Sequence, residues 1–295
     1  MRLYEVMVEW IQFHSISVSA PTVLNYSRTV NILKSSIGEM NIEDITKDDI
    51  QELLIDFYNN GLSENTIINY SKPIRQSLGY AVDKGYIAKS PYKDILMPKT
   101  EKKEINPFTE EEVKKILSVD MPIWFRDAIQ IAFRTGMRKG EIFALMKQDI
   151  DFKNAFLTIR YTQSKTKEGY ILKKPKTKAS RRRVSIDKIT LDILHRRCLQ
   201  GKTDFIFAYP DGKMLIPSGI NAMLDRKCKA AGIQKHRFHD LRHGHATYLL
   251  KNNVHPKIVQ ERLGHSSIKI TLDTYSHLIP GLQVPAIEAI NSLDF

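Results

Sequence analysis

Two polar clusters in the C-terminal two thirds of the chain combine residue types that could bind and activate a phosphate ester. In RTGMRKGE, Arg138 stands three residues before Glu141, so both side chains share a helical face and the carboxylate can brace the guanidinium. In HRFHDLRHGHAT, His239 stands three residues before Arg242 and shares its face in the same way. Arginine keeps its charge and donates two hydrogen bonds to a phosphate, so a pair of arginines favours chemistry at an anionic ester.

A tyrosine follows a third cluster, LGHSSIKITLDTY. Leu263 and Gly264 before His265 are typical of a helix end, and Tyr275 comes ten residues after the histidine. A phenol with a pKa of about 10 is only ~0.1% ionised at pH 7, so Tyr275 would need nearby cations or a base to act as a nucleophile. Taken singly, each cluster also has a simpler interpretation. Arg138 and Glu141 could be a surface ion pair, His239 and Arg242 could be three residues apart by chance, and Tyr275 could be a packing residue.

A basic segment lies between the first two clusters. From Arg160 to Arg183 it holds ten Lys and Arg residues against the single acidic residue Glu168. A lysine on a turn there could protonate a leaving oxygen, and the other cations would dock the phosphates of a polyanion. The candidates for these roles share the end of this segment: Lys174, Lys176, Lys178, Arg181 and Arg182.

The composition favours a nucleic-acid partner and excludes several classes of protein. The formal net charge is +12, and it is concentrated after residue 100, where Lys and Arg exceed Asp and Glu by 14. A chain of 295 residues, 42% of them hydrophobic, suggests two domains with a real core. Two cysteines exclude a disulfide framework, and apolar runs of only about five residues exclude a membrane span. Glu5 and Glu9 interrupt the first apolar stretch, which is unlike a signal peptide, so we expect a cytoplasmic, nucleoid-associated protein.

The histidines of the second cluster raise the alternative of a metal site. His239 and His243 are one helical turn apart and could reach the same ion. However, no glutamate occupies the position that an H-E-x-x-H helix requires, and no carboxylate pair is nearby. The sequence therefore favours a site without a metal.

The first hundred residues are expected to form four helices packed as a small bundle. The expected helix starts are marked by Leu3, Ser19-Ala20-Pro21, Thr46 and Ser63. Pro73 should bend or break the fourth helix, because proline lacks the amide proton that a helix interior uses. Lys72 and Arg75 on this helix are the expected DNA-binding cations of the domain.

A linker and a second, mixed domain are expected after this bundle. The stretch LMPKTEKKEINP has two prolines and little apolar periodicity, so we place a linker at 98–107 between domains at 1–97 and 108–295. Short strands are predicted at 155–161, 170–172 and 183–186. The part of the basic segment between the last two strands is predicted to be a turn. Helical patterns precede and follow them.

Together and in this order, the clusters resemble the tyrosine recombinase family, also called the phage-type integrases. The family pattern is T-G-x-R-x-x-E, a lysine on a β-hairpin, H-x-x-R, and L-G-H followed by tyrosine about ten residues later. The matching residues here are Thr135, Gly136, Arg138, Glu141, Lys176, His239, Arg242, Leu263, Gly264, His265 and Tyr275. The resemblance covers essentially the whole chain. It implies a mainly α fold with a small β-sheet, in which a helical core-binding domain precedes a mixed α/β catalytic domain.

The resemblance also implies a site-specific recombinase that cleaves and rejoins DNA through a 3′-phosphotyrosyl intermediate, without metal, ATP or another cofactor. Tyr275 would be the nucleophile, and His239 would contact the phosphate and help to accept the tyrosine proton. The side chains that would stabilise the phosphate are Arg138, Arg242 and His265.

Two further residues have roles in this scheme. Lys176 would protonate the leaving 5′-oxygen; it is chosen over Lys174 and Lys178 because Lys-Thr before the Arg-Arg-Val strand best matches the family's hairpin. Glu141 would orient the region of Arg138.

The partners expected from the resemblance are double-stranded DNA attachment sites and three further copies of the chain in a homotetramer. A C-terminal exchange segment at about 281–295 would dock on a neighbouring subunit, since its apolar residues have helical spacing. These residues are Val284, Ile287, Ile290 and Leu293. Accessory proteins for excision or DNA bending are further candidates, and no membrane partner is expected.

We favour the integrase of a phage or mobile element among the family's activities. Many relatives carry an additional N-terminal domain that binds arm-type sites, whereas this sequence starts with core-binding helices; it is either of the two-domain type or a piece of a longer chain. A type IB topoisomerase is the nearest enzymatic alternative. A catalytically silent DNA-binding regulator is the alternative from another class, but the complete set of polar residues argues against it.

Overall fold

The computed structural model describes residues 1–100, 105–175, 177–201, 203–275, 287 and 290–293, with residue 178 described by its backbone alone. The chain divides into two compact units. The first contains residues 1–103 and 165–169, and the second contains residues 104–164 and 170–295. Each unit has its own hydrophobic core.

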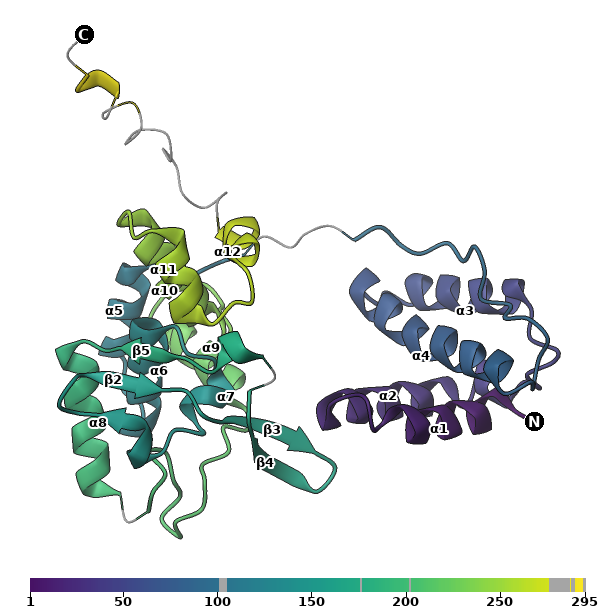
Figure 1. Cartoon of the computed structure of the whole chain (residues 1–295), viewed down its shortest axis with the longest axis horizontal. Coiled ribbons are helices and arrows are strands. Elements are labelled where there is room, and N and C mark those ends of the chain that lie inside the picture. The colour runs from purple at the N-terminus through teal and green to yellow at the C-terminus, as the bar shows by residue number, and fades with distance from the viewer. Residues whose placement is uncertain (101–104, 176, 202, 276–286, 288–289, 294–295) are drawn as a thin grey trace. The chain divides into compact units, whose positions relative to one another are not determined.

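The first unit is a bundle of four α-helices (Figure 1). Its elements are α1 (Leu3–His14), α2 (Ala20–Leu33), the short 3₁₀ helix η1 (Ile37–Glu39), α3 (Lys47–Asn59) and α4 (Glu64–Asp83). The predicted caps begin two of them: the hydroxyls of Thr46 and Ser63 accept from the amides of Asp49 and Thr66. The helix α1 packs against α2 and α4, and α3 packs against α4.

Pro73 does not break the fourth helix, which runs continuously from Glu64 to Asp83. The side chain of Pro73 is buried, as are those of Ile74 and Leu78 after it. Ile67 before Pro73 is buried as well, and the packing of this face outweighs the hydrogen bond that proline removes.

The second unit combines eight α-helices with five short strands within the described residues. Its helices are α5 (Glu110–Ser118), α6 (Ile123–Thr135), α7 (Lys139–Ile142), η2 (Lys147–Asp149), η3 (Lys178–Ser180), α8 (Lys188–Gln200), α9 (Ile220–Ala230), α10 (Asp240–Lys251), α11 (Pro256–Leu263) and α12 (Ile268–Tyr275). Its strands are β1 (Ile150–Asp151), β2 (Phe156–Thr158), β3 (Thr162–Thr166), β4 (Gly169–Lys173) and β5 (Arg183–Ser185). The mainly helical fold class with small sheets is therefore confirmed.

The strands form two small antiparallel sheets, and their pairing differs from the prediction. β2 lies between β1 and β5, whereas β4 pairs with β3 in a separate hairpin (Figure 1). The part of the basic segment between β4 and β5, residues 174–182, therefore connects two sheets and is not the turn of a hairpin. The sequence did not predict β3, because TQSKT has no apolar residue to alternate with its polar ones.

The core of the second unit centres on α6, which packs against α7, α8 and α10. A smaller apolar cluster joins α10, α11 and α12, and Tyr275 belongs to it. In the described part of the chain, no helix is both long and apolar enough to cross a membrane.

We predict that Ile74→Ala destabilises the first unit by about 2–5 kcal/mol, because Ile74 is fully buried and its loss leaves a cavity. Ile55→Ala is the matched control, since Ile55 is exposed on α3 and should change the stability by less than about 0.5 kcal/mol. The measurement is denaturant unfolding followed by Trp10 fluorescence in a Trp124→Phe background, because the chain has two tryptophans. Equal losses in the two variants would contradict this assignment of the core.

Candidate active site

A glycine turn at the end of α6 presents Arg138. Gly136 adopts a left-handed conformation with φ 67°, and a β-carbon there would lie 2.6 Å from the His245 ring and 2.8 Å from a Leu263 methyl group. The position therefore requires glycine for both its backbone angle and its space. Arg138 follows as the residue before α7, and its backbone amide donates to Glu141 over 2.9 Å.

Glu141 is buried and is held between two arginines. Its carboxylate accepts from Nη1 of Arg138 over 2.9 Å and from Nη1 and Nη2 of Arg182 over 3.1 and 2.9 Å. Burial alone would raise the pKa of Glu141, but the charge and hydrogen bonds of Arg182, with the charge of Arg138, hold it below its ordinary value. The carboxylate is therefore ionised at neutral pH and binds the side chain of Arg138, which is the contact that the orienting role expected of Glu141 would need.

Arg182 has a different position from the one predicted. We expected a surface cation that binds DNA, but its side chain is only 6% exposed. Besides the bonds to Glu141, its Nε donates over 2.5 Å to the carbonyl of Arg262 at the end of α11. Arg182 thus joins α7 to α11 and acts as a brace for Arg138, not as a surface cation.

Arg242 connects the three motifs. It lies on α10 with 2% of its area exposed, and it donates to the carbonyls of Gly136 over 2.7 Å and of Leu263 over 2.6 Å. Burial, with the neighbouring charge of Arg138, lowers the pKa of Arg242 to about 9, so it remains a cation at neutral pH. One guanidinium therefore fixes the loop before Arg138 relative to the turn before His265.

The two predicted histidines are neutral at neutral pH. Burial, followed by the charges of Arg242 and Arg138, lowers the pKa of His265 to about 3, and its Nδ1 lies 2.9 Å from the Thr271 hydroxyl of α12. Desolvation by the surrounding elements and the neighbouring His243 lower the pKa of His239 to about 4, although much of its side chain is open to solvent. Both residues would therefore contact a phosphate as neutral hydrogen-bonding groups.

Tyr275 is the last residue of α12 and is 1% exposed. It packs with Leu250, Val259 and Leu263, and its hydroxyl lies 2.8 Å from Nδ1 of His243. Burial raises the pKa of Tyr275 to about 12, against the opposing charges of Arg242 and Arg138. The hydroxyl is therefore a protonated phenol that is shielded from water.

Part of the predicted basic surface is described. Lys176 and the side chain of Lys178 lie outside the described residues. Lys174 and Arg181 line a hollow of about 360 Å³ with Arg160 and Arg183. Such a group of cations could hold a phosphate backbone.

The remaining predicted residues lie elsewhere. Lys72 and Arg75 are exposed on α4 of the first unit, and Lys72 lines a hollow of about 460 Å³ with Arg28. Most of the predicted exchange segment, including Val284, lies outside the described residues.

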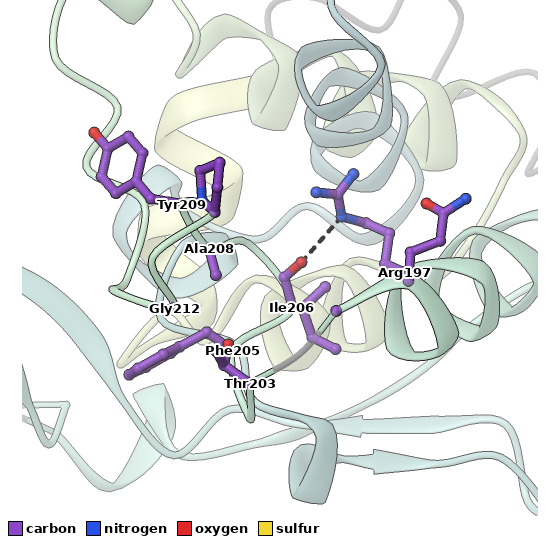
Figure 2. A pocket seen from close by; sticks show the side chains of 10 residues that line it. Arg197, Thr203, Phe205, Ile206, Ala208, Tyr209 and Gly212 are labelled. Carbon is purple, nitrogen blue, oxygen red and sulfur yellow. Dashed lines mark hydrogen bonds between the residues drawn. The ribbon is translucent and has the colours of Figure 1, made fainter.

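Another hollow of about 310 Å³ lies beside the end of α8, and Figure 2 shows its lining. Arg197 reaches its edge and donates to the carbonyl of Ile206 over 3.0 Å, and Phe205 and Tyr209 line it as well. None of the predicted site residues contributes to this lining, so we assign it no part in the chemistry.

Sequence reasoning did not assign His243 a part in the chemistry. It considered His243 only as a metal ligand, although its place one helical turn after His239 was a signal that both could serve one site. The two rings now lie edge to face, with centroids 4.9 Å apart. In the described part of the chain, no group of three His, Cys, Asp or Glu residues could hold a metal ion.

Comparisons with known proteins show the family to which the chain belongs. The phage integrase family matches residues 106–280, and the phage integrase SAM-like domain matches residues 2–104. A protein named tyrosine recombinase XerC-like, from Caldanaerobacter subterraneus subsp. tengcongensis, is 31% identical over 292 residues, which covers 89% of this chain and 75% of the relative. The ICEBs1 integrase of Bacillus subtilis is 28% identical over 289 residues, covering 92% and 76%.

Solved structures show the same fold. The integrase of transposon Tn1549 in complex with transposon right end DNA has a TM-score of 0.82 at 24% identity, covering 99% of this chain and all of that one. A lambda integrase tetramer bound to a Holliday junction has a TM-score of 0.72 at 19% identity, covering 93% and 77%.

We predict that Arg182→Gln lowers the free energy of unfolding of the second unit by about 3–5 kcal/mol, because it leaves the buried carboxylate of Glu141 with one cation fewer. Arg181→Gln is the matched control; its exposed side chain predicts a change below about 0.5 kcal/mol. Denaturant unfolding followed by Trp124 fluorescence in a Trp10→Phe background measures both. Similar losses would show that Arg182 does not brace the site.

The lowered pKa of Glu141 predicts a pH-dependent contribution to stability. Because the folded pKa lies below the ordinary value of 4.5, the stabilisation is complete above about pH 4.5 and is lost as the pH falls through the folded pKa. The stability difference between wild type and Glu141→Gln should therefore be largest near neutral pH and should shrink in acid. Urea midpoints between pH 3 and pH 7 test this, and a difference independent of pH would contradict it.

Proposed function

Since the chain belongs to the phage integrase family, whose members are tyrosine-type site-specific DNA recombinases, we propose that it cleaves and rejoins DNA with Tyr275 as its nucleophile. The Tyr275 oxygen attacks a DNA phosphorus atom and the bond to the 5′-oxygen breaks. The products are a 3′-phosphotyrosyl link and a free 5′-hydroxyl. The covalent link conserves the free energy of the broken ester bond, so rejoining to another strand needs no ATP.

The other site residues bind the phosphate or donate a proton. Arg138 and Arg242 hold the non-bridging oxygens and stabilise the charge that builds up in the transition state. His265 donates a hydrogen bond to the same phosphate. Lys176 gives its proton to the leaving 5′-oxygen, in keeping with its place in the basic segment.

The observation that carries this proposal is the convergence of three separate motifs. Arg242 bonds to the carbonyls of Gly136 and Leu263, and the charges of Arg138 and Arg242 both act on Tyr275 and on His265. Attack on a phosphodiester requires cations near the nucleophile, since they offset the charge of the ester, and the charges of Arg138 and Arg242 are near enough to act on Tyr275.

We propose that the DNA substrates are attachment sites of a phage or mobile element, because the similar proteins include an integrase and transposases. A homotetramer would act on two such sites, with residues 281–295 of each subunit docked on the next. This proposal is supported by the lambda integrase tetramer that shares the fold. Accessory proteins for excision or DNA bending would set the direction of the reaction.

We predict that Tyr275→Phe lowers the yield of covalent protein–DNA adduct by more than about 10³-fold, because phenylalanine has no oxygen to attack phosphorus. The substrate is DNA that flanks the protein's own gene, incubated in EDTA and denatured with SDS. Tyr248→Phe is the matched control; Tyr248 is exposed on α10 and its loss should leave the yield unchanged.

The outcomes separate this function from the alternatives. Tight DNA binding without adduct from wild type would favour a silent DNA-binding regulator. Adduct with plasmid relaxation but without recombinant products would favour a topoisomerase. An adduct from Tyr275→Phe would mean that another residue is the nucleophile.

A further inference from the structure

We propose that His243, not His239, accepts the phenolic proton when Tyr275 attacks DNA. The inference rests on the proposed function and adds a residue outside the predicted set. It reassigns to His243 the proton transfer that the family resemblance implied for His239.

The geometry separates the two histidines. Nδ1 of His243 lies 2.8 Å from the Tyr275 hydroxyl, with ring centroids 5.7 Å apart. Within the described residues, the hydroxyl has no other hydrogen-bond partner. The His239 ring contacts that of His243, with centroids 4.9 Å apart, whereas the hydrogen bond of the Tyr275 hydroxyl goes to His243.

Burial makes this contact the route for the proton. Tyr275 is 1% exposed, so little water reaches its hydroxyl and the group in contact with it at neutral pH is His243. When the phenol donates to Nδ1, the neutral His243 ring carries its own proton on Nε2. The hydrogen bond thus already joins the donor and acceptor atoms of the proton transfer.

The charged groups around His243 allow it to accept a proton and then to hold it. Burial lowers the pKa of His243, as do the charges of Arg242 and Arg237, so the ring is neutral and able to accept at neutral pH. Asp240, on the same helix, acts in the opposite direction and favours the protonated ring. Tyr275 itself faces the ring from α12, and His239 faces it from the start of α10.

The step balances in both directions. As the Tyr275 oxygen bonds to phosphorus, its proton moves to Nδ1 of His243, and the departing 5′-oxygen takes a proton from the general acid proposed above. In rejoining, a 5′-hydroxyl gives its proton back to that general acid as its oxygen attacks phosphorus, the bond between tyrosine and phosphorus breaks, and His243 returns its proton to the tyrosine oxygen.

The test uses His243→Asn, because the asparagine oxygen can still accept the hydrogen bond of Tyr275 but cannot take up a proton. We expect single-turnover cleavage to fall by about 10²–10⁴-fold at pH 7, with unchanged DNA affinity in a gel shift. The rate of the variant should rise with pH as solvent ionises the phenol. His243→Ala should behave in the same way and should recover cleavage when imidazole is added.

Two further variants make the comparison specific. His195→Ala is the control; His195 is exposed on α8 and contacts Phe152, away from the motifs, so cleavage should not change. His239→Ala should lose cleavage without recovery by imidazole or high pH, because its ring contacts the phosphate and not the phenol.

The contrary results are equally specific. Undiminished or faster cleavage by His243→Asn would overturn the inference, as would a loss that neither alkaline pH nor imidazole relieves. Recovery by imidazole in His239→Ala instead would return the role to His239. A wild-type protein that forms no covalent adduct would overturn the proposed function itself, whereas the other results leave that function standing.

Discussion

The arrangement of the site depends on two ionic side chains that are held away from water. A buried charge is costly unless its hydrogen bonds are satisfied, and Arg242 and Glu141 satisfy theirs with groups from different motifs. Arg242 uses the carbonyls of Gly136 and Leu263, while Glu141 uses two guanidinium groups. Neither charge can be placed correctly unless the ends of α6 and α11 are placed correctly too. The cations that face the nucleophile are therefore fixed by the same contacts that hold the second unit together.

The proposed nucleophile, Tyr275, is a protonated phenol that needs a base before it can attack. Packing on α10 and α11 shields the Tyr275 hydroxyl and raises its pKa to about 12, although two cations lie near enough to oppose the shift. Desolvation therefore outweighs the attraction of the cations in the protein without DNA. A phosphate in the site would neutralise those cations further, so ionisation of the phenol requires a base within hydrogen-bond reach. The ring of His243, 2.8 Å from the Tyr275 hydroxyl, is in the position that such a base requires.

Much of the fold could be predicted from local chemistry, and the errors have identifiable causes. The caps at Thr46 and Ser63 bind the amides they were expected to bind, and Glu141 braces Arg138 as its spacing indicated. Arg182 could not be distinguished from its two arginine neighbours, because nothing in RRR reveals which side chain faces a buried carboxylate. Likewise, the pairing of β5 with β2 depends on contacts between segments far apart in the sequence.

The most direct test of this account is to locate the covalent bond itself. After cleavage in EDTA, nuclease digestion and trypsin treatment, tandem mass spectrometry would examine the peptide of residues 270–295, which contains one tyrosine. The account predicts a nucleotide attached to Tyr275 through a 3′-phosphate. A nucleotide attached to any other residue, or linked through a 5′-phosphate, would contradict it.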